Sequence, residues 1–134
     1  MNPNYERVAE KAAETITKFG ISSDPVDLIP IIGRIPGVVL VSYEKMSNEA
    51  GMDREKMIEM FGNDKPDAFT SVNLIDGKVQ YLITYNKRLP NEDIQKVLAR
   101  ELGHIVLGHD GSRPQEVRDE EARCFAEHLL GMVL

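Results

Sequence analysis

Residues 70–85, TSVNLIDGKVQYLITY, constrain the fold more than any other stretch of this chain, because they predict a β-hairpin. Two runs rich in β-branched and aromatic residues flank the dipeptide Asp76-Gly77. Such a dipeptide accepts the positive φ angles of a type I′ turn, whose twist matches that of the adjoining strands. The fold must therefore contain an antiparallel pair of strands, and the rest of the chain has to cover it.

Before the hairpin, the sequence predicts helices and one further strand. An amphipathic helix over residues 4–19 ends at Gly20, which suits a left-handed C-cap. Its inner stripe consists of Val8, Ala12, Ile16 and Phe19. The pair Asp24-Pro25 predicts the start of a short helix over residues 25–32 that ends at Gly33. The β-branched run at residues 37–43 predicts a strand.

Residues 47–61 predict one or two short helices, with Asp53 as the N-cap of the second. We interpret the apolar residues of this segment as core filling. They are Met57, Met60 and Phe61.

After the hairpin, two longer helices are predicted. The first spans about residues 92–108 and has Asn91 as its N-cap. The second spans about residues 113–130, and Ser112 and Gln115 have the spacing of a capping box. Helices, a strand, a hairpin and two further helices in this order indicate an α+β fold with a small, mainly antiparallel sheet.

Length and charge narrow the class of protein. A chain of 134 residues with 42% hydrophobic residues suits one domain spanning residues 1–134. The net charge of −6 argues against a general nucleic-acid binder. The longest apolar stretch, LIPIIGRIPGVVLV, is interrupted by proline, glycine and arginine, so no membrane span or membrane partner is expected. Cys124 is the only cysteine, which favours a reducing, cytoplasmic location.

The segment Arg100-Glu101-Leu102-Gly103-His104 lies in the frame of the zinc-binding helix motif H-E-x-x-H, with arginine at the first position. Glu101 shares the apolar stripe of Ile94, Leu98 and Ile105, where a carboxylate needs a compensating partner. In a zinc peptidase this glutamate is the general base that takes a proton from metal-bound water. Glu101 is therefore the candidate catalytic residue, and His104 a candidate metal ligand.

The last helix carries a second carboxylate on an apolar face. Glu121 lies four residues after Val117 and four before Phe125. A glutamate on a downstream helix is a typical third zinc ligand, so Glu121 is the second candidate for the metal. Glu120 is a weaker candidate, because its stripe contains only Val117 and Cys124.

Together, RELGHIVLGH and EEARCFAEHLL resemble the ImmA/IrrE family of metallo-endopeptidases over roughly residues 25–130. In that family an H-E-x-G-H helix is followed by a Glu-Ala-x-x-Phe-Ala segment whose glutamate is the third zinc ligand. The matching glutamate here is Glu121, and Tyr85-Asn86 matches the approach to the motif helix. The resemblance implies a zincin-like fold, a cytoplasmic protein, and action on helix-turn-helix repressors of mobile elements by cleavage or by antagonism.

Arg100 departs from the family pattern at the first ligand position. A guanidinium stays protonated and has no lone pair for a metal. We therefore expect zinc to be absent or weakly bound. Our hypothesis is that Arg100 replaces the charge of the ion and pairs with Glu121 or Glu101.

The alternative keeps a weak metal site at His104 and Glu121 with a third group. His109 requires the chain to turn back at Gly108, and Cys124 with His128 forms an i, i+4 pair on the last helix.

Three functions stay open from the sequence. The chain is a zinc endopeptidase with impaired activity on a repressor, an inactive relative that binds a repressor or other protein without cutting it, or an interaction domain unrelated to these targets.

Overall fold

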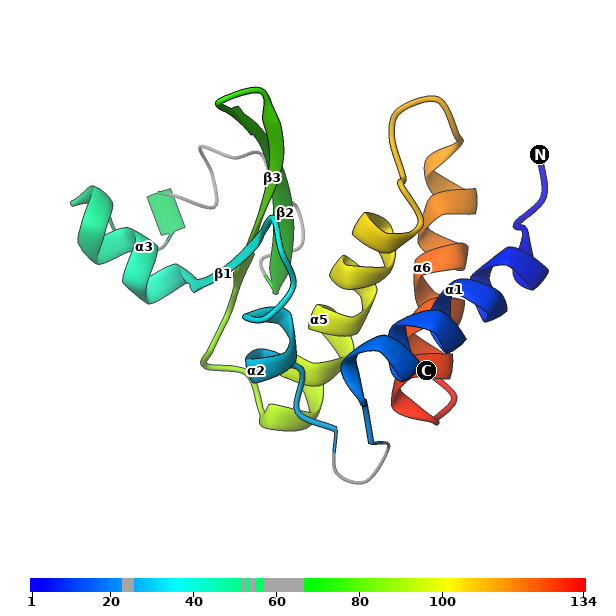
Figure 1. Ribbon diagram of the computed structural model, residues 1–134. Helices are drawn as coiled ribbons and strands as arrows, with labels where there is room; N and C mark the ends of the chain where they lie inside the picture. The colour runs from blue at the N-terminus through cyan, green and yellow to red at the C-terminus, as the bar shows by residue number, and fades with distance from the viewer. Residues whose placement is uncertain (23–25, 52, 54, 57–66) are drawn as a thin grey trace.

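The computed structural model describes residues 1–22, 26–51, 53, 55–56 and 67–134. Within these ranges it contains a three-stranded sheet and five helices, an α+β arrangement as predicted. Figure 1 shows α5 between the sheet and α6, and α1 packed against α6. None of the helices in the described ranges is long and apolar enough to cross a bilayer.

The elements follow one another along the chain. Their bounds are α1 (Tyr5–Phe19), α2 (Leu28–Ile32), β1 (Val38–Ser42), α3 (Tyr43–Ala50), β2 (Ala68–Ile75), β3 (Lys78–Tyr85), α5 (Asn91–Val106) and α6 (Gln115–Leu130).

The sheet has the order β1-β3-β2 and is mixed. β2 and β3 form the predicted antiparallel hairpin, and both turn residues have positive φ: 52° at Asp76 and 77° at Gly77. β1 pairs parallel to β3, which corrects the expectation of a mainly antiparallel sheet. α3 lies in the connection between β1 and β2. After the hairpin turn, β3 runs in the same direction as β1 and pairs with it.

The predicted ends of α1 are confirmed. Asn4 is the N-cap, and its side chain accepts a hydrogen bond from the Arg7 backbone N–H. Gly20 ends α1 with φ 62°, a left-handed conformation that glycine adopts without steric cost.

Several predicted helix starts need correction. The N-cap of α2 is Asp27, and Asp24 and Pro25 lie outside the described residues. α3 begins at Tyr43, directly after β1, because Ser42 caps its N-terminus; the prediction placed the first helix of this segment at residue 47. Asp53 accepts a hydrogen bond from the Lys56 backbone N–H at 2.7 Å, as a capping residue does. Met57, Met60 and Phe61 lie outside the described residues.

Neither Asn91 nor Ser112 caps its helix. Pro90 and Pro114 occupy the two N-cap positions in extended conformations, so each helix begins one residue after a proline and without a side-chain cap. Asn91 is already helical, and its side chain accepts from the Gln95 amide instead. Ser112 bonds to Asp110 in the preceding turn. In both cases the extended proline, rather than a capping side chain, redirects the chain into the helix.

The α5–α6 packing positions everything that follows. Gly103 of α5 faces α6, and a Cβ atom at this position would lie 3.0 Å from Phe125 Cδ1 and 3.3 Å from Ala122 Cα. The absent side chain thus allows the two helices to approach closely. Leu98, Leu102, Phe125 and Leu129 are fully buried around this contact.

Candidate functional site

Two adjoining clefts lie between β2 and α6, over the exposed side of α5. The larger has a volume of about 540 Å³ and is bounded by the start of β2, α5 and the first half of α6. The smaller has a volume of about 240 Å³ and is bounded by Thr70, Val72 and Tyr81 of the hairpin and by the facing ends of α5 and α6. Glu101, His104 and Asp119 line both clefts, so the motif helix forms their common wall.

Glu101 faces the sheet and has one hydrogen-bond partner among the described side chains. The Thr70 hydroxyl on β2 donates to Glu101 Oε2 at 2.7 Å. Burial raises the pKa of the Glu101 carboxyl; the hydrogen bond from Thr70 works against this, and the nearby negative charge of Asp119 adds to it. Glu101 is therefore a carboxyl group at the cleft wall with a pKa above its ordinary value, which suits a general base or acid.

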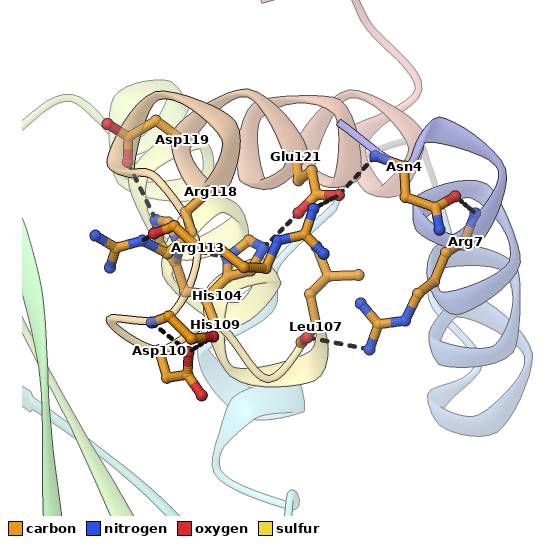
Figure 2. A network of polar contacts seen from close by, with 11 residues as sticks. Asn4, Arg7, His104, Leu107, His109, Asp110, Arg113, Arg118, Asp119 and Glu121 are labelled. Atoms are coloured by element: carbon orange, nitrogen blue, oxygen red, sulfur yellow. Dashed lines mark hydrogen bonds and ion pairs between the residues drawn. The ribbon is translucent and has the colours of Figure 1, made fainter. Parts of the chain in front are cut away.

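His104 does not contact Glu121; His109 stands between them (Figure 2). The Nδ1 atoms of His104 and His109 are 2.8 Å apart, and His109 Nε2 is 3.0 Å from Glu121 Oε1. The chain turns back at Gly108, whose φ is 65°, and this turn brings His109 under the end of α5. His109, a weaker candidate from the sequence, is thus the residue that joins the other two.

The contacts that link His104, His109 and Glu121 decide which ring nitrogen of each histidine carries the proton. Burial lowers the pKa of His104 to about 4, with a smaller contribution from His109, and burial also lowers the pKa of His109. Both rings are therefore neutral at pH 7. Because a carboxylate only accepts, His109 carries its proton on Nε2 and accepts at Nδ1 from His104 Nδ1–H. His104 Nε2 is then an acceptor at the cleft wall, 3.9 Å from Asp119 Oδ1.

Glu121 is fully buried, and donors of the protein surround its carboxylate (Figure 2). Besides His109, the Asn4 backbone N–H donates to Oε2 at 2.7 Å and the Arg113 guanidinium at 2.9 Å. Burial by itself raises the pKa of Glu121, but the hydrogen bonds from Asn4 and His109 and the charge of Arg113 outweigh it and leave the pKa below its ordinary value. Glu121 is therefore a stable buried carboxylate.

The cation beside Glu121 is Arg113, not Arg100. Arg100 is exposed at the rim of the larger cleft, and within the described ranges its side chain makes no ion pair with Glu121 or Glu101. The expected pairing of Arg100 is thus wrong. Position 100 lies on the cleft side of α5, whereas Glu121 turns toward α1 and the 108–114 turn, where Arg113 reaches it.

The weaker candidates on α6 lie apart from this network. Glu120 pairs with Arg123 and accepts from the Tyr5 hydroxyl, and these hydrogen bonds lower its pKa to about 2. Cys124 packs against the core, and burial raises the pKa of its thiol. His128 is exposed on the last turn of α6.

The motif helix offers one imidazole, His104, where the H-E-x-x-H pattern supplies two ligands. Arg100 has no lone pair to donate, and three donors already bond to Glu121: the Asn4 N–H and Arg113 at Oε2 and His109 at Oε1. Across the described part of the chain, no group of three or more histidine, cysteine, aspartate or glutamate side chains has an arrangement that could hold a metal ion.

A family comparison agrees with the order of the two motifs. Residues 39–130 match the model of the Peptidase M78 family, described as the IrrE N-terminal-like domain. The chain belongs to the IrrE N-terminal-like family. The matched range includes the hairpin, α5, α6 and all but the first residue of β1, so the family relationship covers the elements that line the clefts. Neither the curated proteins nor the solved structures contain a match to this chain.

Sequence reasoning missed three contributors to the site: Thr70, Asn4 and Arg113. Thr70 lies 31 residues from Glu101 in the sequence, and Asn4 lies 117 residues from Glu121, the carboxylates to which they donate. Arg113 lies in a turn, where helical periodicity gives no direction. No signal in the sequence pointed to Asn4, since its backbone N–H, not its side chain, makes the contact.

Proposed function

We propose that this member of the IrrE N-terminal-like family binds a repressor-like regulatory protein and does not cut it by zinc chemistry. The observation that carries the proposal is the state of Glu121, whose buried carboxylate is satisfied by the Asn4 N–H, Arg113 and His109. In a zinc peptidase the matching glutamate keeps a lone pair for the metal. Here a cation and two neutral donors compete for the same carboxylate oxygens.

Arg100 supports the same conclusion from the other side of the site. The first ligand of an H-E-x-x-H helix has to be a neutral imidazole, and a guanidinium repels a divalent ion. Without a metal to acidify water, Glu101 alone is a weak catalyst for peptide hydrolysis. What the fold retains is a cleft beside an edge strand, which is sufficient to hold a protein segment.

A second candidate is an impaired endopeptidase. It is favoured by Glu101, which sits at the cleft wall with the raised pKa of a general base. In this case His104 Nε2, which carries a free lone pair in the tautomer inferred above, would be one weak ligand for zinc.

The two candidates are separated by metal content and by cleavage. The chain is purified in the presence of zinc, its metal content is measured by atomic emission, and it is mixed with a helix-turn-helix repressor of a mobile element. We expect less than stoichiometric zinc and a complex of two intact chains. One tightly held zinc per chain, with repressor cleavage that disappears in Glu101→Gln, would support the endopeptidase instead.

Restoring the missing ligand gives a sharper version of this test. Arg100→His supplies the first imidazole, and Arg34→His, on an exposed site elsewhere, is the matched control. We expect neither variant to gain tight zinc, because Glu121 stays committed to its protein partners. Stoichiometric zinc in Arg100→His alone would show that the remaining ligands are still arranged for a metal.

A further inference from the structure

The outer strand of the sheet lacks the features that keep edge strands apart. From Thr70 to Ile75, β2 reads TSVNLI, with no charged residue and no proline, and no described strand pairs with its outer side. Edge strands of monomeric proteins are commonly protected by charges, prolines or bulges, because their free N–H and C=O groups otherwise recruit another strand. This segment is therefore chemically suited to receive one.

Apolar side chains extend this edge beyond the part of the sheet that α5 covers. Val72 is 62% exposed, Leu74 73%, Ile75 50% and, on β3, Val79 52%. Leu74 pairs with Val79 and Val72 with Tyr81, so these four side chains share the face on which Thr70 reaches Glu101. Ile75, the neighbour of Leu74, lies on the opposite face. The exposed apolar surface thus continues directly into the two clefts.

The clefts follow the inner face of β2. Ala68 lines the larger cleft, and Thr70 and Val72 line the smaller one, which is the alternation of residues on one face of a strand. A segment paired with β2 would direct every second side chain into these clefts. Ile105 and Tyr81 offer an apolar wall in the smaller cleft.

Charge selects what enters the larger cleft. Its wall includes the exposed acids Asp67, Glu116 and Asp119. Of its two arginines, Arg123 is already paired with Glu120 and Glu127. The acids therefore outnumber the one remaining arginine, Arg100, and the cleft favours a cation.

We propose that β2 and these two clefts receive an extended segment of a partner protein, which adds as a strand and places a lysine or arginine side chain in the larger cleft and an apolar side chain against Val72. This inference rests on the proposed function and specifies the partner: an extended basic and apolar segment, recognised by backbone pairing and by charge. The partner's basic and apolar side chains lie an even number of residues apart along that segment, because only every second residue faces the clefts.

The first experiment uses peptides as probes, without metal. An acetylated, amidated peptide of repeated Lys-Ser-Val-Ser, which puts lysine and valine on one face of a strand, is compared with the same peptide carrying glutamate in place of lysine and with the lysine peptide N-methylated on alternate backbone nitrogens. Affinity is measured by fluorescence anisotropy, and the site is located by amide NMR shifts. We expect the lysine peptide to bind about tenfold or more tightly than the glutamate peptide, with shifts at residues 70–75 and 100–104. The N-methylated peptide should lose binding.

Two double variants test the contribution of the acidic residues of the larger cleft separately. Glu116→Gln combined with Asp119→Asn should weaken the lysine peptide about threefold to tenfold, and about 0.5 M salt should reduce the difference from the parent chain. Glu10→Gln combined with Glu14→Gln, which removes two exposed acids from α1, is the control and should leave the affinity unchanged.

Three results would overturn the inference: equal affinity for the lysine and glutamate peptides, equal affinity for the N-methylated peptide, or a dimer in sedimentation that buries residues 70–75. These outcomes are independent of the proposed function, which fails instead on bound zinc and on repressor cleavage. A chain that binds the peptide and also holds zinc would keep this inference and lose the other.

Discussion

The two carboxylates of the site, Glu101 on α5 and Glu121 on α6, are treated in opposite ways by the fold. Both lie among apolar residues, yet Glu101 has one described donor, Thr70, and a raised pKa, whereas Glu121 has three donors and a lowered pKa. Burial pushes both values upward, so the number of donors decides the outcome. Glu101 keeps proton chemistry available at the cleft, while Glu121 has become a structural anion.

The largest expected effect comes from removing the structural anion. Glu121→Ala should lower the free energy of unfolding by about 3–5 kcal/mol, because it leaves Arg113, His109 and the Asn4 N–H without their acceptor. Urea denaturation followed by circular dichroism measures the change. Glu120→Ala removes a carboxylate from the next position but only from a partly exposed pair, and it should cost about 1 kcal/mol or less. Equal losses in the two variants would contradict the contrast.

The pH dependence of stability tests the histidines that separate the two acids. The pKa of His104 is about 4 in the folded chain and 6.5 when unfolded, so between these values the unfolded chain binds more protons and stability falls as the pH is lowered. The loss across this window should be roughly 2–3 kcal/mol, after allowance for the 28% exposure of the side chain. His104→Asn should flatten the curve of unfolding free energy between pH 6.5 and 4.

His128→Asn, on the exposed turn of α6, is the control and should leave the slope unchanged. The acids add effects of opposite sign that overlap this window, so the comparison of His104→Asn with the parent chain isolates the histidine. Glu121 has a lowered pKa, so its stabilisation is lost as the pH falls below 4.5. Glu101 has a raised pKa, so its ionisation costs stability as the pH rises above 4.5.

A third test concerns the close packing of α5 and α6, the two helices that carry Glu101 and Glu121. Gly103→Ala adds a Cβ atom 3.0 Å from Phe125 Cδ1 and 3.3 Å from Ala122 Cα, so the Phe125 side chain or the facing backbone of α6 must give way by a few tenths of an ångström. The expected cost is about 1–3 kcal/mol in thermal unfolding, partly offset by the better helix propensity of alanine. Gly111→Ala, where the added atom meets nothing within 4 Å, should be close to neutral. No difference between these variants would show that the packing of α5 on α6 is looser than the geometry indicates.

The smallest expected effect concerns the single donor to Glu101. Thr70→Val removes the hydroxyl that donates to Glu101 and should raise the pKa of this carboxyl further. The stability change should be about 1 kcal/mol or less, because the site lies at a cleft that water reaches. Carbon-13 NMR of the glutamate carboxyls follows the titration, with Thr70→Ser as the control that keeps the hydroxyl. A lower pKa in Thr70→Val would show that Thr70 is not a donor to the carboxylate.

The sequence predicted what depends on local chemistry. The Asp76-Gly77 turn, the Gly20 cap and the periodicities of α1, α5 and α6 are decided by residues a few positions apart, and they are confirmed. Helix starts failed where an extended proline replaced a capping side chain, as at Pro90 and Pro114. The apolar stripe of α6 also placed Glu121 in the interior, because a helix buries every third or fourth residue whatever its neighbours are.

Tertiary structure alone decided the partners of the buried groups. A charge on an apolar stripe requires a compensating partner. The sequence predicted this requirement for Glu101 and Glu121 but did not identify the partner residues. The answer came from a strand 31 residues away, from an amide at the start of the chain, and from an arginine in a turn. Such contacts depend on how elements distant in sequence are packed, and no periodicity along one helix encodes that packing.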